Sequence, residues 1–358
     1  MEEKSRVIWI TQFPLSGVSF GIVSYILLSS LSDKYNFYCL SFGYEGQPLK
    51  VNNFTILPFR SSTEIPFYWK EINPELVVLF HSFFALPKMF GTGRFKEPSI
   101  LYLPIEGYRL PQSYHSYLQN FERILVPSKW SKDALARDYF ESEVIYHGVD
   151  TSFFKPIERK HSKITFGYLG SNDLRKQIPT LIEAFSMIKG KKQLNLACPI
   201  KGYVNFGDIA RELKVVPKFQ KALGRGIPVN PAKIRDFYYT LDVYVSLGTE
   251  GFGLPALESA ATGIPTIAMN FGASKEILGK SALYVEPCTT QYSPLGKVGV
   301  VDAKEVAYLM QYLLEDRNER ERLGKLGIKR AKQFSWENPI RKLDKILEEE
   351  IKYGKKRN

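Results

Sequence analysis

The segment Ser246–Pro265 reads SLGTEGFGLPALESAATGIP and decides the kind of fold that this chain adopts. A strand pattern ends at Gly248, a glycine-rich turn follows, and a helical pattern opens with Pro255, a residue that suits the first helical turn. Glycines let the backbone approach a ligand, and the N–H groups at a helix N-terminus favour an anion. The segment therefore predicts a strand–turn–helix unit that holds a phosphate, although the same glycines also fit a tight turn without a ligand.

Two carboxylates accompany this turn. Glu250 lies in it, and Glu258 follows eight residues later on the helix. Carboxylates beside a phosphate site fit a sugar ligand, because they accept hydrogen bonds from vicinal hydroxyls while the N–H groups bind the phosphates. One site could thus hold the ribose, the pyrophosphate and the hexose of a nucleotide sugar.

Apolar runs and amphipathic segments alternate on both sides of this segment, which predicts βαβ units and parallel sheets. We expect strands at 7–11, 37–42, 75–80, 99–104, 123–128, 163–170, 194–199, 243–248, 266–269 and 283–287. We expect helices at 20–32, 112–120, 129–139, 177–189, 231–240, 255–262 and 273–279, and three more without strands at 302–316, 318–333 and 336–352.

The order of strands restarts near residue 163, after a charged, proline-containing stretch at 147–163 that we interpret as a linker. The prediction is an α/β protein with two Rossmann-like, doubly wound domains facing across a cleft. Residues 1–155 would form the N-terminal domain and 156–335 the C-terminal domain, with 336–358 as a helix that packs back on the first.

Composition narrows the class of protein. The 358 residues are 44% hydrophobic, which is enough for ordinary cores, and no apolar run approaches the ~18 residues of a membrane span. The start, MEEKSRVIWI, is charged and leads directly into a strand, so it does not read as a signal peptide. The three cysteines are scattered and predict no disulfide framework. We therefore expect a cytoplasmic protein.

The formal net charge of +12 is unevenly distributed. Residues 1–160 hold 17 basic and 16 acidic side chains, so nearly all of the excess lies in the C-terminal part. A basic surface can attract nucleic acid, anionic lipid or a phosphorylated substrate. Solvated helix faces and the basic terminus KYGKKRN explain most of it, and we do not expect a nucleic-acid partner.

The stretch EGFGLPALESAATGIPTIA closely resembles the signature of retaining GT-B glycosyltransferases of glycosyltransferase family 4, including its two glutamates eight residues apart. Further matches follow in the family's order: VPSKW, YHGVDTSFFKP, GYLGSNDLRKQIPTLIEAF, NFGASKEI and LLEDRNERERLGKLGIKRAKQFSWE. The resemblance implies a hexosyltransferase that takes a nucleotide-diphosphate sugar and a glycan, lipid-linked or protein acceptor. It also allows peripheral contact with the cytoplasmic face of a membrane.

The resemblance also implies roles for the residues of the C-terminal half. Glu250 would contact the transferred sugar, Glu258 the ribose, and Lys176 the pyrophosphate. Arg175 stands beside Lys176, where it could replace an arginine that many members carry at the preceding strand end. The remaining donor-binding candidates are backbone or loop positions, namely Gly251, Phe252, Gly253, Leu254 and Asn172.

The N-terminal half matches the family less closely. FPLSGVSFG supplies a glycine-rich loop with Gly17 as the donor-facing candidate. Where members often carry a histidine near the reacting sugar, this chain has Glu106, and a different histidine, His81, ends the strand ELVVLF. Either residue could serve as the catalytic group of this half, and each also fits an ordinary strand-end position.

No zinc-ligand spacing, P-loop or Asp-x-Asp motif occurs, so we expect neither a metal nor a cofactor. Departure of the nucleotide diphosphate would then depend on Lys176, Arg175 and a helix dipole. Two other classes remain open: a glycan phosphorylase or synthase on the same scaffold, and a non-catalytic binder of sugar nucleotides or nucleic acid. A phosphorylase of this kind would normally require a lysine in a sequence context that binds pyridoxal, and we identify no such context.

Overall fold

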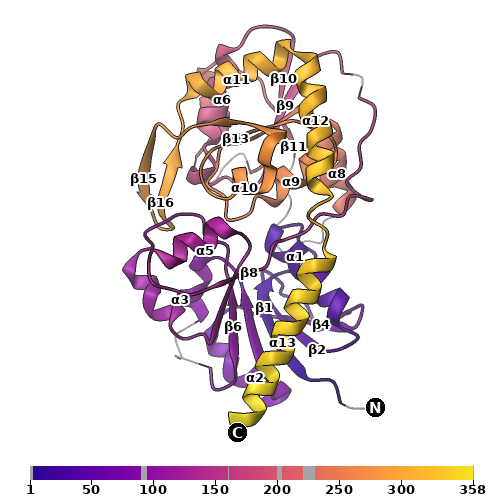
Figure 1. Cartoon of the computed structure of the whole chain (residues 1–358), viewed down its shortest axis with the longest axis vertical. Coiled ribbons are helices and arrows are strands. Elements are labelled where there is room, and N and C mark those ends of the chain that lie inside the picture. Colours follow the sequence, from indigo (N-terminus) through magenta and orange to yellow (C-terminus); the bar gives the residue numbers. More distant parts are fainter. Residues whose placement is uncertain (1–2, 90–94, 160, 200–203, 221–229, 358) are drawn as a thin grey trace.

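The computed structural model describes residues 3–89, 95–159, 161–199, 204–220 and 230–357 and folds into two α/β units, one above the other in Figure 1. The strand patterns above correspond to real strands, and most apolar residues of these runs are buried. The predicted fold class is confirmed.

The N-terminal sheet has eight strands in the order β3-β4-β2-β1-β5-β6-β7-β8. All its neighbours pair in parallel except β3 with β4. Its strands are β1 (Arg6–Gln12), β2 (Asn36–Phe42), β3 (Leu49–Val51), β4 (Phe54–Pro58), β5 (Leu76–Phe80), β6 (Ser99–Tyr102), β7 (Arg123–Val126) and β8 (Glu143–Val144). Its helices are α1 (Ser19–Leu31), α2 (Ile65–Ile72), α3 (Leu86–Met89), α4 (His115–Leu118) and α5 (Lys129–Ala136).

The C-terminal sheet is parallel, with six strands in the order β11-β10-β9-β12-β13-β14. These are β9 (Ile164–Leu169), β10 (Lys192–Ala197), β11 (Lys218–Gln220), β12 (Val243–Ser246), β13 (Thr266–Met269) and β14 (Ala282–Val285). A separate antiparallel hairpin follows, β15 (Thr289–Ser293) with β16 (Gly296–Val300). The helices are α6 (Ile178–Met187), α7 (Phe206–Glu212), α8 (Pro231–Tyr239), α9 (Leu254–Ala261), α10 (Ser274–Leu278), α11 (Ala303–Glu315), α12 (Arg317–Ala331) and α13 (Glu337–Arg357).

Several expectations need correction. The helix expected at 112–120 is a 3₁₀ turn, Gln112–Tyr114, followed by the four residues of α4, and neither element has a side-chain cap at its start. The patterns also missed β3, β4, β8, β11, α2, α7 and the β15–β16 hairpin. Most of these elements are short or lie at sheet edges, where one-sided burial leaves little apolar signal.

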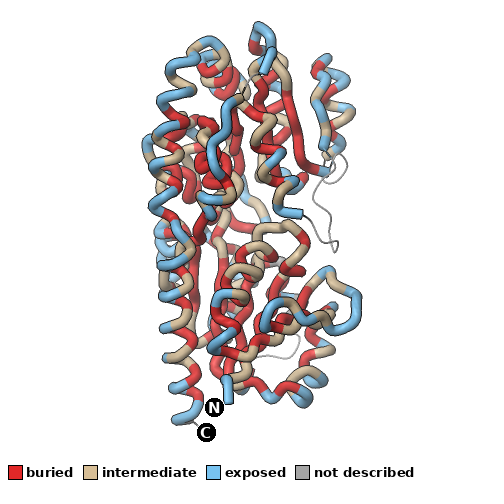
Figure 2. The backbone as a smooth tube through the Cα atoms, turned by 90° about the vertical axis from the view of Figure 1, so that its right-hand side faces the viewer, coloured by how far each residue is buried: buried red, intermediate tan, exposed pale blue. Residues whose placement is uncertain are grey.

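Helix α13 runs down the N-terminal unit beside α1, as Figure 1 shows in yellow. Lys34, directly after α1, contacts Asp344 at 2.9 Å, and the Arg123 guanidinium donates to Glu349 at 2.8 Å. Buried segments run through the centre of both units in Figure 2. The chain thus returns to its first unit after completing the second.

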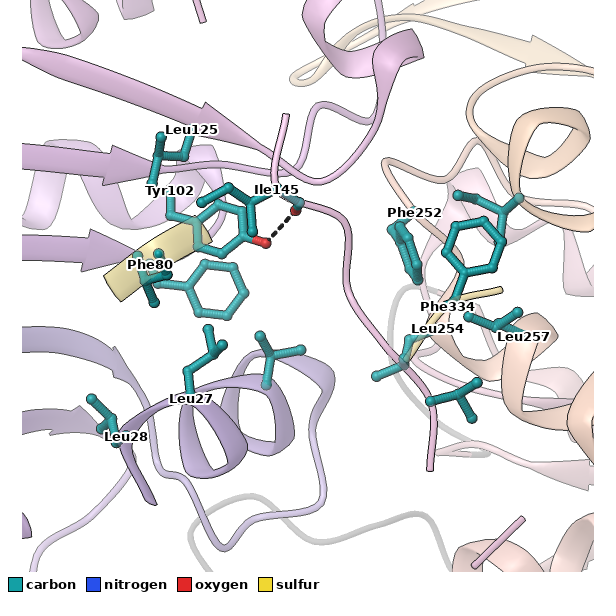
Figure 3. Packing of buried hydrophobic residues seen from close by; sticks show 14 of the residues in the cluster. Leu27, Leu28, Phe80, Tyr102, Leu125, Ile145, Phe252, Leu254, Leu257 and Phe334 are labelled. Carbon is teal, nitrogen blue, oxygen red and sulfur yellow. Dashed lines mark hydrogen bonds between the residues drawn. The ribbon is translucent and has the colours of Figure 1, made fainter. Parts of the chain in front are cut away.

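One hydrophobic cluster extends from the first unit into the second. It joins Leu27, Phe80 and Tyr102 with Phe252, Leu257 and Phe334. Figure 3 shows both groups, together with the hydrogen bond from the Tyr102 hydroxyl to the Ile145 carbonyl oxygen (2.6 Å). The two units are therefore packed on each other through apolar side chains.

Candidate active site

The strand order of each sheet reverses at one point, which is where open α/β sheets bind ligands. In the C-terminal sheet that point lies between β9 and β12, and in the N-terminal sheet between β1 and β5. The loop after β9 carries Arg175 and Lys176, and the loop after β12 carries Glu250. The topology thus brings together candidates that are 74 residues apart.

The glycine-rich turn after β12 contacts the N-terminal unit directly. A Cβ atom on Gly251 would lie 2.9 Å from the Ile105 carbonyl oxygen, so only glycine fits. The Gly251 carbonyl oxygen accepts hydrogen bonds from the hydroxyls of Ser128 (2.7 Å) and Ser131 (3.2 Å). Gly251 therefore joins the two units.

The next three residues start helix α9. Gly253 adopts a left-handed φ of +90° as its N-cap, and Leu254 is the first helical residue. Phe252 points away from solvent, with its ring centroid 4.8 Å from that of His147. Its side chain is thus part of the interdomain core.

Four charged side chains meet between the units. Lys176 forms an ion pair with Glu250, and Arg175 forms one with Glu106 of the N-terminal unit at 2.6 Å. Arg175 also donates to the Thr249 carbonyl oxygen at 3.0 Å. Burial raises the pKa of Glu106, and the positive charges of Arg175 and Lys176 oppose that rise. Two cations and two carboxylates thus form a compact cluster across the interface.

Local structure holds the two cations in place. The Asp173 side chain caps the 3₁₀ turn Leu174–Lys176 by accepting from the Arg175 N–H. A Cβ atom on Gly248 would lie 2.9 Å from Cδ of Lys176, so glycine at this position leaves room for the lysine.

Gln177 was not among the candidates from the sequence. It directly follows the turn Leu174–Lys176 and anchors it to neighbouring strands and loops. It is buried, with a left-handed φ of +52°, and its amide donates to the carbonyl oxygens of Leu247 (2.6 Å) and Gly299 (3.2 Å). Its side-chain oxygen accepts from the Val301 N–H at 2.9 Å. These partners are 70 to 124 residues away, so no local pattern could have identified the role.

Glu258 lies on α9 behind this cluster and is only 4% exposed. The Tyr238 hydroxyl donates to its carboxylate at 2.8 Å. Burial raises the pKa of Glu258 to about 7, and the Tyr238 hydrogen bond lowers it. Tyr238 lies 20 residues before Glu258, on another helix, so no local pattern pairs the two residues.

Known proteins share part of this sequence and its fold. The family model of glycosyl transferases group 1 matches residues 149–330, about half of the chain. The chain belongs to this family. O-antigen chain mannosyltransferase B of Escherichia coli is 26% identical over 246 residues, which cover 64% of this chain and 61% of that relative. The chain therefore spans less than two thirds of the relative's length.

Solved structures of this architecture cover almost the whole chain. Sucrose-phosphate synthase from Thermosynechococcus elongatus superposes with a TM-score of 0.79 at 16% identity, over 97% of this chain and 99% of that one. Anabaena HepE in complex with UDP-glucose gives a TM-score of 0.73 at 13% identity, over 96% and 99%. At such identities the likeness supports the GT-B fold of this group 1 glycosyl transferase and nothing finer.

His81 directly follows β5. Its Nδ1 accepts from the Ser82 N–H at 2.9 Å, so the proton of a neutral ring is on Nε2, which lies 3.1 Å from Oε1 of Gln12. Its ring stacks on Phe20 at 5.1 Å. These contacts fix the tautomer and orientation of the ring.

The two remaining candidates lie in loops. Gly17 has a φ of +71° in the loop after β1, and α1 begins two residues later without a side-chain cap. The Asn172 amide donates to the carbonyl oxygens of Pro199 (3.0 Å) and Val204 (2.8 Å). Asn172 thus connects the loops that follow β9 and β10.

The residues that the structure describes contain no group of three or more His, Cys, Asp or Glu side chains arranged to hold a metal ion. None of the helices in that part of the chain has both the length and the apolar character of a membrane span.

Proposed function

We propose that this protein is a retaining, metal-independent glycosyltransferase of glycosyltransferase family 4, which moves a hexose from a nucleotide-diphosphate sugar to an acceptor hydroxyl. The observation that carries the proposal is the charged cluster at the switch point of the C-terminal sheet, where Lys176 and Glu250 meet. A cation beside a carboxylate suits a donor that presents a diphosphate beside a polyhydroxylated ring.

In this proposal the cations and the two glutamates bind different parts of the donor. Lys176 and Arg175 bind the diphosphate and neutralise the negative charge that grows on it as its bond to the anomeric carbon breaks. Glu250 accepts hydrogen bonds from hydroxyls of the transferred hexose, and Glu258 accepts from those of the ribose. Because two cations already face the diphosphate, the leaving group has compensating charge from the chain itself.

The acceptor enters from the N-terminal side, which contributes Glu106 to the charged cluster. In the net reaction the acceptor oxygen forms a bond to the anomeric carbon, the bond from that carbon to the diphosphate oxygen breaks, and the proton of the acceptor hydroxyl passes to the released diphosphate. Net retention is the stereochemistry we propose. A glycan is the acceptor class we propose, because the Escherichia coli relative is an O-antigen chain mannosyltransferase.

The donor can be identified by thermal shift. GDP-mannose is the first choice because of that relative, and UDP-glucose the second because of the HepE complex. An ADP-sugar completes the panel. A donor at 100 times its Kd should stabilise the protein by about 2.7 kcal/mol, which raises the melting temperature by several degrees.

Turnover of that donor then tests the site. Lys176→Ala and Glu250→Ala should each lower kcat/KM by about 10²- to 10³-fold, because each removes a group that stabilises the departing or transferred moiety. Lys304→Ala and Glu183→Ala, on exposed helix faces, are matched controls that should keep wild-type turnover. Wild-type rates in both site variants would show that the proposed site is wrong.

A further inference from the structure

The β15–β16 hairpin reaches from the C-terminal unit to the N-terminal unit, as Figure 1 shows in orange at the boundary between them. Its five residue pairs run from Thr289 with Val300 to Ser293 with Gly296. No motif of the sequence indicated it, and the function proposed above assigns it no role. Its two ends contact segments that lie next to members of the charged cluster in the sequence, Thr249 and Gln177 at one end and Tyr108 at the other.

The base of the hairpin is attached to the loop that carries Glu250. The Gly299 N–H donates to the Thr249 hydroxyl oxygen at 3.2 Å, and Gln177 hydrogen bonds to the backbone of both Gly299 and Val301. Thr249 in turn accepts from Arg175 through its carbonyl oxygen at 3.0 Å. The base is therefore fixed relative to the two cations.

The tip of the hairpin pairs with the backbone of the N-terminal unit. The Lys297 N–H donates to the Tyr108 carbonyl oxygen at 2.7 Å, and the Tyr108 N–H donates back at 3.1 Å. Leu295 is 4% exposed and packs into a core cluster made otherwise of N-terminal residues. A Cβ atom on Gly107 would lie 2.4 Å from the Leu295 carbonyl oxygen, so the two backbones are in direct contact.

Glu106 precedes this paired segment, with only Gly107 between it and Tyr108. Its carboxylate lies 2.6 Å from the Arg175 guanidinium. We infer that the β15–β16 hairpin positions Glu106 against Arg175, so that Glu106 competes with the nucleotide diphosphate for this cation. The identity of the competing ligand rests on the proposed function, whereas the positioning itself rests on the contacts above.

The experiment measures the affinity of UDP and of GDP by calorimetry, because neither carries the transferred hexose, which could itself contact Glu106. Glu106→Gln should tighten binding about tenfold by removing the carboxylate that lies nearest to Arg175, at 2.6 Å, while the longer pairs with Asp173 (3.4 Å) and Glu250 (3.8 Å) remain. Lys297→Pro removes the N–H that donates to Tyr108, and Gly107→Ala forces the backbones apart. Each of these two substitutions should raise the nucleotide affinity about as much as Glu106→Gln does when it is made in the wild-type protein. Neither should change the affinity further when it is added to Glu106→Gln. Gln291→Ala, exposed on the same hairpin, should leave affinity unchanged.

Hydrogen exchange provides the folding control. In Lys297→Pro the amide of Tyr108 should lose protection, while those of β1 and β5 keep it. Lost protection with unchanged nucleotide affinity would overturn the inference, as would an equal effect in the wild-type and Glu106→Gln backgrounds. If Gly107→Ala fails to fold, Lys297→Pro alone decides.

A ligand-free measurement separates this inference from the proposed function. Glu106→Gln and Arg175→Gln should lower the melting temperature by less in combination than the sum of their separate effects. That coupling should disappear in Lys297→Pro, and its persistence would refute positioning by the hairpin. If neither UDP nor GDP binds the wild-type protein, the proposed function fails, and this coupling still decides whether the hairpin positions Glu106.

Discussion

Glu258 shows at the scale of one residue how burial couples a proposed ligand group to pH. Burial raises its pKa to about 7 in the folded protein, above the value of about 4.3 for an exposed glutamate. The folded state therefore binds the extra proton between these two values, and stability should fall as pH rises from about 4.3 through 7. At about 1.4 kcal/mol per pKa unit, the loss amounts to at most about 4 kcal/mol.

Glu258→Gln removes this titration and keeps an oxygen that can accept from Tyr238. Its melting temperature should equal or fall slightly below that of the wild type at pH 4 and exceed it by several degrees at pH 8. Calorimetry across this range checks the expectation. A difference between the two proteins that does not change with pH would contradict the raised pKa.

Gln177 is the second residue whose role is testable by itself. Gln177→Leu keeps the size of the side chain but leaves the carbonyl oxygens of Leu247 and Gly299 and the Val301 N–H without their partner. The expected cost is about 2–4 kcal/mol in the free energy of unfolding, measured with urea. Gln291→Leu, on the exposed face of β15, is the matched control and should change it by less than about 0.5 kcal/mol. Equal stabilities in the two variants would refute the anchoring role.

These residues also show what a sequence can and cannot reveal. Glu250 and Glu258 stand in one contiguous motif, so their spacing was visible, and so was the cation pair that opens α6. Gln177, Tyr238 and Thr249 act through partners that only the folded chain brings near. Glu106 and His81 gave no comparable signal, because a side chain in the loop after a strand has no sequence signature until its neighbours are known.

At the scale of elements, the patterns identified the elements that are buried on both sides. Strands such as β1, β9 and β12 are continuous apolar runs, and α11 has a clear amphipathic period. The β15–β16 hairpin gave no such signal, since Thr289–Ser293 is largely exposed and the apolar tip residue Leu295 is buried only by the other unit. Its position depends on tertiary contact and could not be read locally.

Helix α5 carries a prediction at this scale. Two N–H groups at the start of α5, those of Lys129 (2.9 Å) and Trp130 (3.0 Å), donate to the two carboxylate oxygens of Glu276, which belongs to α10. The Tyr146 hydroxyl also donates to this carboxylate, at 2.7 Å. A carboxylate at a helix N-terminus is favoured by the helix dipole. Here it comes from the opposite unit, so it stabilises their contact as well as the helix.

Glu276→Ala should therefore lower the free energy of unfolding by about 1–2 kcal/mol. Glu276→Gln, which keeps one accepting oxygen, should lose less. Glu183→Ala, exposed in the middle of α6, is the control and should be neutral. Urea unfolding measures all three, and an alanine variant as stable as the control would rule out the capping role.

At the scale of the whole molecule, the two units are connected by more than the chain segment between them. The glycine-rich turn, the hairpin and Glu276 each cross the boundary, and α13 returns along the first unit. The side chains that α13 buries there include Leu343, Leu347 and Ile351. Such connections should make the units unfold together rather than one after the other.

Leu347→Asp tests that cooperativity. Leu347 is fully buried, and a carboxylate in its place should cost at least about 3 kcal/mol and detach α13 from the first unit. Calorimetry should then show two transitions where the wild type shows one, because the C-terminal unit keeps its own core while the N-terminal unit loses the cover of α13. Lys352→Asp places the same charge on the exposed face of the helix and should keep a single transition. If Leu347→Asp instead unfolds in a single transition at the wild-type temperature, α13 does not hold the units together. The glycine-rich turn, the hairpin and Glu276 would then be the contacts that make the two units unfold together.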